Sequence, residues 1–380
     1  MDFNLTREQH DIIQAAREFA SKEFEDVAVD FDREERFDLR LWKAACDLGF
    51  VGVFIDEAYG GAGYGFLEHA LITEEFWAVD PGIGTAILAA TFGAELLLLH
   101  GSEDQKRLVL PKLAAGEAIL ATAVTEPGTG SDVAGASTTA VRDGDEWVVN
   151  GSKMFITGGD LAHYVNLFAL TNPDHPSRHQ RHSFLLVPTD TPGFEAVKLK
   201  GKMGVRASHT AELFFSDVRV PAENLIGEEG EGFSEVMDLF NRVRPMVAAM
   251  GVGVARGALD ASIRYARKRE AFGAPIGSFQ LIQAKLAEMA TLVQAARALY
   301  YQAAWLLDQG MVDHSLIAMA KWYAGEIAVR CADEAVQIHG GYGYMDEYKV
   351  QRFYRDAKIV ELWEGTKEIE KLIIARRLLS

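Results

Sequence analysis

The stretch 118-AILATAVTEP-127 marks the point at which the character of this sequence changes. Before it, apolar residues recur at helical spacing, as in the series Ile12, Ala15, Ala16 and Phe19, which follows the i, i+3, i+4, i+7 pattern of an amphipathic helix. After it, apolar runs become short and rich in Val, Thr and Phe, with Gly, Pro, Asp and Asn between them. This change predicts that helices give way to β-strands near residue 119.

The strand-like character continues to about residue 228 and is typical of a small β-sandwich or barrel. The Gly- and Glu-rich linker IGEEGEGF then leads into long amphipathic segments joined by short loops, a pattern that favours a four-helix bundle. We therefore predict an α+β fold with three domains. They are an N-terminal helical domain at residues 1–118, a middle β domain at 119–228 and a C-terminal helical bundle at 229–380.

Composition excludes several classes of protein. The 380 residues carry a net charge of −17, which opposes a general nucleic-acid surface. The longest apolar stretch, GIGTAILAATFGAELLLLHG, is interrupted by glycines and by Glu95, so it predicts buried helices and no membrane span. The first residues lack a secretory signal, and we expect a cytoplasmic enzyme. Two isolated cysteines, Cys46 and Cys331, predict neither a disulfide framework nor a metal site.

Three segments combine glycine with polar side chains and are candidates for ligand binding. They are AVTEPGTGSDVAG at 123–135, YARKREAFGAPIGSFQLIQ at 265–283 and QIHGGYGYMDEYKVQRFYRDAK at 337–358. Glycines allow backbone N–H groups to approach a ligand closely, and hydroxyls add further donors. Composition alone leaves open a turn for the first segment, a basic helix end for the second and a helix C-terminus with an ion-paired face for the third.

A fourth segment, LWEGTKEIEKLII at 362–374, places Glu364 between the bulky Trp363 and Gly365. Either a catalytic carboxylate or a buried acid paired with an arginine such as Arg244 fits this pattern. Thr366 is a suitable N-cap for the helix that follows. Its first turn would hold Glu368 and Glu370 against the helix dipole, and its inner face would bury Ile369, Leu372 and Ile373.

These segments, in this order over α, β and α regions, resemble the acyl-CoA dehydrogenase family of flavoproteins along essentially the whole chain. AVTEPGTGSDVAG and QIHGGYGYMDEYKVQRFYRD each fit a family signature. The resemblance implies an FAD held without a Rossmann domain, between the β domain and the helical bundle. It also implies that two subunits share each FAD within a homotetramer.

The resemblance assigns the FAD ring to the segments around Thr122–Ser131 and Phe155–Thr157, with Thr157 near the flavin N5. The neighbouring subunit would reach the pyrophosphate and adenosine portions. Phe155 stands where the family often has Trp. The residues implied for FAD binding are Thr122, Val124, Thr125, Gly130, Ser131, Phe155, Thr157, Arg269, Phe272, Phe279, Gln280, Gln337, Gly340, Gly341, Thr366 and Glu368.

For the reaction, the resemblance implies that Glu364 abstracts the α-proton of an acyl-CoA thioester while the β-hydrogen leaves as hydride to FAD. Some relatives place the base at a position that is Val243 here, and valine cannot accept a proton. Asn241 and Val243 stand where medium-chain members commonly carry Asp and Thr. The residues implied for substrate binding are Ser131, Ser208, Phe240, Asn241, Val243, Arg244, Trp363 and Gly365.

The acyl group should lie between Glu364 and the stretch TAILAATFGAELL, which has no Lys or Arg to hold a second carboxylate. An uncharged short, medium, branched or alicyclic acyl chain is therefore favoured. Electrons would pass to electron-transferring flavoprotein. Two alternatives remain: an acyl-CoA oxidase, which uses O2, and a flavin-bearing DNA-binding relative, which the −17 net charge and the retained Glu364 oppose.

Overall fold

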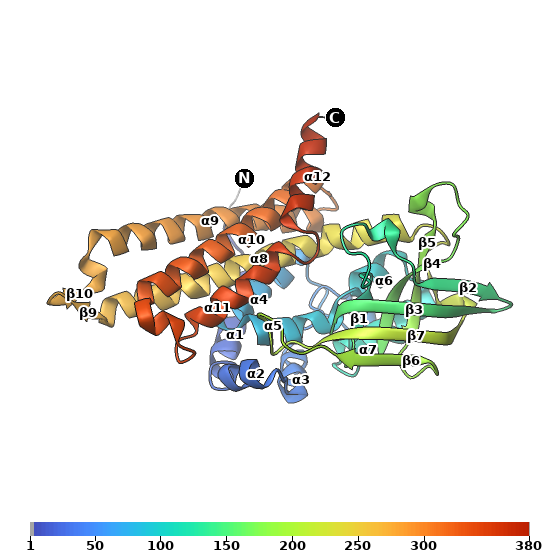
Figure 1. Cartoon of the computed structure of the whole chain (residues 1–380), viewed down its shortest axis with the longest axis horizontal. Helices are drawn as coiled ribbons and strands as arrows, with labels where there is room; N and C mark the ends of the chain where they lie inside the picture. The colour runs from blue at the N-terminus through green and yellow to red at the C-terminus, as the bar shows by residue number, and fades with distance from the viewer. Residues whose placement is uncertain (1–3, 380) are drawn as a thin grey trace.

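A computed structural model of the chain describes residues 4–379, and its elements follow the order predicted: helices, then strands, then helices (Figure 1). The α+β fold class is therefore confirmed, while the residues at which the three domains begin and end stay predictions. The helices of the first part are α1 Arg7–Glu23, α2 Ala28–Glu34, α3 Leu39–Asp47, α4 Phe66–Val79, α5 Pro81–Leu88, α6 Ala94–His100 and α7 Glu103–Ala114.

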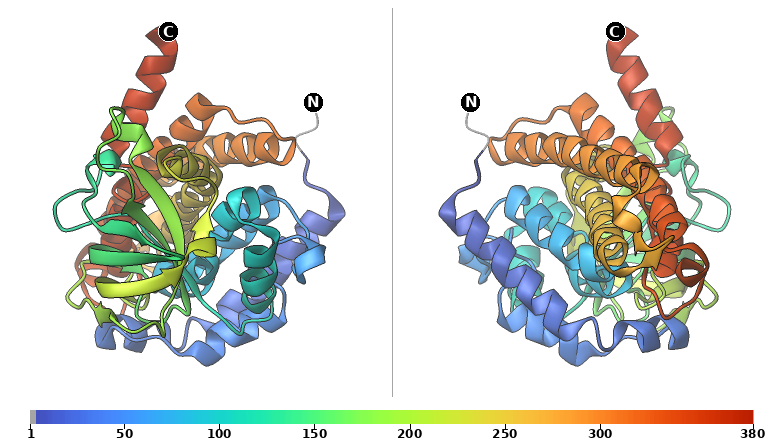
Figure 2. Two further views of the ribbon diagram at one scale, coloured as in Figure 1. Left: turned by 90° about the vertical axis from the view of Figure 1, so that its right-hand side faces the viewer. Right: turned by 90° about the vertical axis from the view of Figure 1, so that its left-hand side faces the viewer.

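The middle part is one eight-stranded sheet with the order β6-β7-β3-β2-β4-β5-β8, and β1 pairs with β4. Most pairings are antiparallel, but β1 runs parallel to β4, with Leu120 opposite Tyr164. Figure 2 shows this sheet end-on, beside the N-terminal helices. The strands are β1 Leu120–Ala123, β2 Thr139–Asp143, β3 Glu146–Thr157, β4 Tyr164–Leu170, β5 His182–Pro188, β6 Phe194–Lys198, β7 Thr210–Pro221 and β8 Leu225–Ile226.

Three long helices dominate the last part of the chain. The first of them packs against the other two and against α4. Small residues permit the close approach, since a Cβ added at Gly251 would lie 2.7 Å from the carbonyl oxygen of Ala324. The elements of this part are α8 Gly232–Lys268, β9 Glu270–Ala271, β10 Ala274–Pro275, α9 Gln280–Asp308, α10 His314–His339, α11 Val350–Ala357 and α12 Lys367–Leu379.

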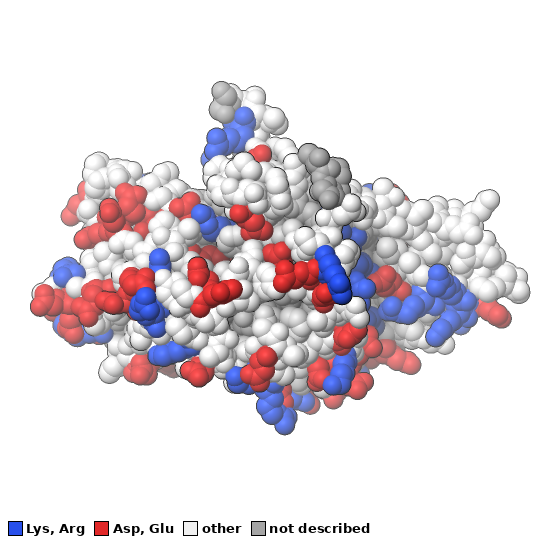
Figure 3. All heavy atoms as spheres, turned by 180° about the vertical axis from the view of Figure 1, so that it is seen from behind, with Lys and Arg blue, Asp and Glu red and all other residues white. Residues whose placement is uncertain are grey.

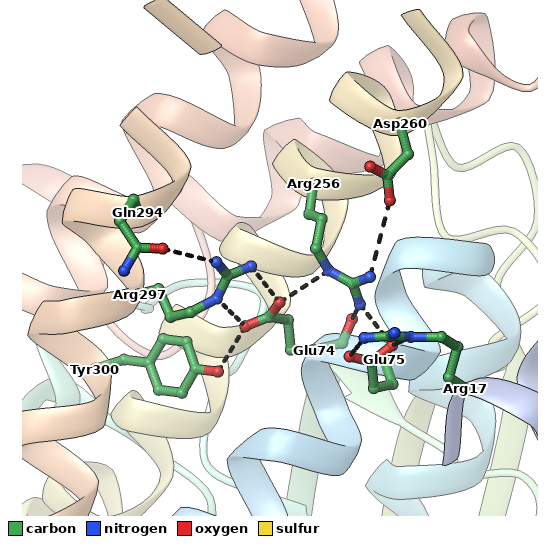
Figure 4. Close-up of polar contacts among 8 residues, drawn as sticks. All are labelled: Arg17, Glu74, Glu75, Arg256, Asp260, Gln294, Arg297 and Tyr300. Carbon is green, nitrogen blue, oxygen red and sulfur yellow. Dashed lines mark hydrogen bonds and ion pairs between the residues drawn. The ribbon is translucent and has the colours of Figure 1, made fainter. Parts of the chain in front are cut away.

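A buried ionic network fixes the N-terminal helices to the bundle (Figure 4). Glu74 and Glu75 lie on α4 and are each only 4% exposed. Arg256 of α8 contacts both carboxylates at 2.8 Å, and Arg297 of α9 lies 2.6 Å from Glu74. Arg17 of α1 adds a contact of 2.9 Å to Glu75. Because buried carboxylates require charged partners, this network ties four helices into one unit.

Two segments, Pro81–His100 and Gly232–Lys268, are apolar enough by length and composition to cross a membrane, and 72% and 83% of their most apolar windows are buried inside the chain. The first of them was predicted to form buried helices, and in the structure it is divided between α5 and α6.

The predicted inner face of α12 is partly wrong. Leu372 is 50% exposed, because α12 projects away from the bundle (Figure 1). Ile374 and Glu370 are the buried residues of this helix.

Candidate active site

The turn that carries Glu364 has an unusual backbone. Glu364 has φ 52° and Gly365 has φ 100°, so two consecutive residues lie in the left-handed region. A Cβ at Gly365 would also lie 2.3 Å from Oε1 of Glu370. Glycine is therefore the residue that fits there. Thr366 then caps α12, accepting a hydrogen bond from the backbone N–H of Ile369 at 3.4 Å, as predicted.

Three buried side chains hold this turn. Nε of Arg244, on α8, donates to the carbonyl oxygen of Glu364 at 3.0 Å and lies 3.1 Å from Oε1 of Glu370. Nζ of Lys321, on α10, donates to the carbonyl oxygen of Gly365. The alternative that Arg244 forms an ion pair with Glu364 is therefore wrong. Arg244 pairs with the carboxylate of Glu370 and binds only the backbone of Glu364.

The carboxylate of Glu364 is left free. The residue is half-buried, but its Oε2 is enclosed and has no hydrogen-bond partner within residues 4–379. Burial raises the pKa of Glu364 to about 7, although Arg244 and Lys321 act to lower it. A carboxyl with a pKa near neutrality is suited to accept a proton at physiological pH, and stabilising hydrogen bonds would make it a weaker base.

Apolar residues also lie next to the turn. The ring of Trp363 lies 5.8 Å from that of Trp77 on α4, and Val243 is 1% exposed on α8. Since valine cannot accept a proton, position 243 supplies no second base. A separate cavity brings Thr157 of β3 together with residues of α5 and the turn after it. Its lining includes Thr85, Ala86, Ala89, Ala90, Thr157 and Ser208.

The two segments predicted to hold the flavin ring meet along the C-terminal half of β3, where the backbone N–H of Met154 donates to the carbonyl oxygen of Thr125 at 2.9 Å. A register shift in β3 between Lys153 and Ile156 places Phe155 at φ 63° with 66% of the residue exposed. A Cβ added at Gly130 would meet nothing within 4 Å. An exposed aromatic ring beside an open glycine loop fits a flat cofactor such as FAD.

A buried ion pair beneath this loop was not predicted from the sequence. Nζ of Lys153 lies 2.9 Å from Oε1 of Glu126 and donates to the carbonyl oxygen of Val124 at 3.0 Å. Glu126 also accepts from the backbone N–H groups of Ser137 and Thr138 at 2.7 and 2.8 Å. The pair ties the loop to β3 and to the residues that directly precede β2. The only sign of this ion pair in the sequence is that Lys153 stands at an inward position of a strand whose other inward positions are apolar.

A second group of predicted FAD residues lies at the other end of the molecule. Phe272 is 98% exposed, with its ring 6.1 Å from that of Phe279, and Arg269 lies over Tyr342 at 5.6 Å. This group lies at the C-terminal end of α8, whose 37 residues span about 55 Å, and the β-sheet lies toward the other end of that helix (Figure 1). Also at this end are Gln280, Gln337, Gly340 and Gly341, all exposed.

The predicted site residues differ in how far they are exposed. Ser208, Asn241 and Arg244 are buried, whereas Ser131 and Glu368 are exposed. Thr122 of β1 is 7% exposed, and its hydroxyl donates to the carbonyl oxygen of Phe92. The guanidinium of Arg244 lies 5.6 Å from the ring of Phe240. The half-buried residues of the predicted set are Val124, Thr125, Thr157, Phe240, Phe279, Trp363, Gly365 and Thr366.

Models of known protein families match nearly all of the chain. The N-terminal, middle and C-terminal domain models of acyl-CoA dehydrogenases match residues 6–117, 121–218 and 230–379. A probable acyl-CoA dehydrogenase, YngJ of Bacillus subtilis, is 43% identical with 100% of both chains covered. An acryloyl-CoA reductase (NADH) of Anaerotignum propionicum is 42% identical, with 100% of this chain and 96% of that protein covered.

Solved structures share the fold. Butyryl-CoA dehydrogenase of Megasphaera elsdenii superposes with a TM-score of 0.97 at 38% identity and covers 100% of both chains. A chain solved in work on the electron transferring flavoprotein of Acidaminococcus fermentans gives a TM-score of 0.97 at 40% identity, again covering 100% of both. The chain therefore belongs to the acyl-CoA dehydrogenase family, and it is an FAD-dependent oxidoreductase.

Proposed function

We propose that Glu364 is the base that removes the α-proton of an acyl-CoA thioester, which the enzyme converts to the 2-enoyl-CoA. The observation that carries this proposal is its enclosed carboxylate oxygen without a partner, together with the pKa of about 7 that burial gives Glu364. The backbone N–H of Glu364 would donate to the thioester oxygen and stabilise the charge that develops there. Arg244 and Lys321 hold the carbonyl oxygens of this turn and so keep that N–H in place.

The cofactor would lie on residues of two subunits. The part of the sheet around Thr125, Phe155 and Thr157 would hold the ring, and Arg269 and Phe272 of a neighbouring subunit would hold the adenosine end. When bound, FAD accepts the substrate's β-hydrogen as a hydride. Support for sharing comes from the place of Arg269 directly after the C-terminal end of α8, a helix of 37 residues and about 55 Å, whereas the Glu364 turn contacts Arg244 in its N-terminal half.

This arrangement requires an oligomer, and a homotetramer is proposed. The 41.8 kDa chain should sediment as a species of four copies when FAD is bound. A monomer that retains FAD would contradict the sharing of the cofactor. A cytoplasmic location is proposed as well, and the two cysteines of the chain are both free and buried, which is compatible with a reducing compartment.

The substrate is proposed to carry a short uncharged acyl chain. Trp363 and Trp77 restrict the space beside Glu364, and residues 85–97 contain no Lys or Arg. Anaerobic titration should therefore show loss of the visible flavin absorption with butyryl-CoA and no loss with glutaryl-CoA at the same concentration, because a second carboxylate would be buried without a partner. Equal reduction by both would contradict the assignment of an uncharged pocket.

The electron acceptor is proposed to be electron-transferring flavoprotein. Structural similarity to a chain solved in work on such a flavoprotein supports this choice. After reduction by butyryl-CoA, reoxidation should be fast with that flavoprotein and slow in air-saturated buffer; the reverse order would favour an oxidase. The DNA-binding alternative has no support on the face shown in Figure 3, where acidic and basic side chains are mixed, and the net charge is −17.

A further inference from the structure

Charged groups from four helices face the proposed base. Arg244 of α8, Lys321 of α10 and Glu370 of α12 all influence the ionisation of Glu364. On α6, burial raises the pKa of Glu95, and the charge of Glu364 adds a smaller increase. Two of these groups are cations that would draw charge onto Glu364 and weaken it as a base. Burial outweighs the two cations, and the negative charge of a nearby acid opposes them as well.

Glu370 occupies the position from which it can do so. Its side chain is fully buried, and its Oε1 lies 3.1 Å from Nε of Arg244, whose side chain is 5% exposed. Neither carboxylate oxygen of Glu370 makes a hydrogen bond of ordinary geometry to any residue of the described chain, 4–379. Such a buried acid is costly unless a nearby cation compensates for it, so its presence beside the catalytic turn requires an explanation.

The geometry of the turn gives that explanation. Arg244 uses the same Nε to contact the carbonyl oxygen of Glu364 and the carboxylate of Glu370. Oε1 of Glu370 also fills the space next to Gly365 that any Cβ would need. Glu370 therefore meets the cation and the backbone of the catalytic turn at once, without contacting the reacting atoms.

Resting on the function proposed above, we propose that Glu370 is a positioning residue for Glu364. Its carboxylate takes Arg244 as counter-ion and offsets the positive charge of Lys321. The carboxylate of Glu364 thus stays unpaired and able to accept the substrate's α-proton at neutral pH.

The direction in which the pKa of Glu364 shifts distinguishes this role of Glu370 from a merely structural one. In Glu370→Gln, an isosteric change, Arg244 and Lys321 would face Glu364 without an opposing charge, and the pKa of Glu364 would fall. In Lys321→Gln, an amide could still donate to the carbonyl of Gly365, but one cation would be gone and the pKa of Glu364 would rise. Disturbed packing alone gives no reason for opposite shifts.

The test is a pH titration of Glu364 in the purified holoenzyme of the wild type and each variant. Its carboxyl infrared band, assigned by subtracting the spectrum of Glu364→Gln, reports protonation without turnover. The pH dependence of flavin reduction by butyryl-CoA gives a second readout. We expect the midpoint to fall by about 1 pH unit in Glu370→Gln and to rise in Lys321→Gln. Glu326→Gln, which removes an exposed carboxylate from α10, should leave it unchanged.

An unchanged midpoint in Glu370→Gln, or shifts of the same sign in both variants, would overturn this role for Glu370. If Glu370→Gln does not fold, the absence of a rise in Lys321→Gln would overturn it instead. Failure of the proposed function has a different signature: the wild type would then show no flavin reduction by any acyl-CoA, whereas the infrared titration would still test the electrostatic coupling.

Discussion

Flavin reduction by butyryl-CoA is expected to slow by about 10²- to 10⁴-fold when Glu364 is replaced by glutamine, because an amide cannot accept the α-proton. The substitution keeps the size of the side chain and leaves the contacts of the turn in place, since Arg244 and Lys321 bind its backbone carbonyls. Stopped-flow measurement of the loss of visible flavin absorption under anaerobic conditions gives the rate directly.

The stability of this variant supplies an internal control. Burial raises the pKa of Glu364 from 4.5 to about 7, so the folded state is penalised progressively as pH rises through that range, and the penalty is complete above pH 7. Glu364→Gln removes the penalty and should melt at the same or a higher temperature than the wild type at pH 8. A slow variant that also melts much lower would indicate misfolding and not the loss of a base.

The second large effect concerns the ion pair beneath the flavin loop. Lys153→Met is expected to lower the free energy of unfolding by about 3 to 5 kcal/mol, because it leaves the buried carboxylate of Glu126 without its cation. Nζ of Lys153 is 2.9 Å from Glu126, and neither side chain is more than 4% exposed. Denaturant unfolding at pH 7 measures the loss, and FAD content should fall with it since the loop joins β1 to the ring site.

A double variant and the pH dependence of stability both test whether the unpaired charge of Glu126 causes this loss. Lys153→Met with Glu126→Gln should recover most of the lost stability, because no unpaired charge remains. Burial raises the pKa of Glu126, but Lys153 and the N–H groups of Ser137 and Thr138 together lower it to about 2, so the ionised pair stabilises the wild type above pH 4.5 and is lost toward pH 2. The deficit of Lys153→Met should therefore be smaller at pH 4 than at pH 7. A deficit independent of pH would point to packing.

The sequence predicted the order of the three parts because periodicity and turn residues act locally. Apolar spacing before residue 118 and short Val- and Thr-rich runs after it correspond to α1–α7 and to β1–β7. Two-residue pairings such as β8 and β9 were not predicted, since they depend on which strand lies alongside. Burial of Leu372 was predicted from periodicity alone, which cannot show that α12 leaves the bundle.

The sequence predicted some residues of the candidate site and missed the roles of others. Glu364 and Gly365 were identified through the family motif, and the structure adds the left-handed backbone that requires glycine. The predicted dipole role of Glu370 missed its burial and its contact with Arg244, because partners 126 positions apart leave no local pattern. For the same reason the roles of Lys321 and Lys153 emerged only from packing, where each buried ammonium finds an oxygen from a distant element.

The central claim is that Glu364 removes the α-proton, and exchange of that proton tests it most directly. In D2O, the wild-type holoenzyme should wash deuterium into the α-position of butyryl-CoA, and ¹H NMR should show loss of the α-proton signal. Glu364→Gln should show no exchange above the rate in buffer, while Glu326→Gln should exchange like the wild type. Exchange at an undiminished rate in Glu364→Gln would contradict the account.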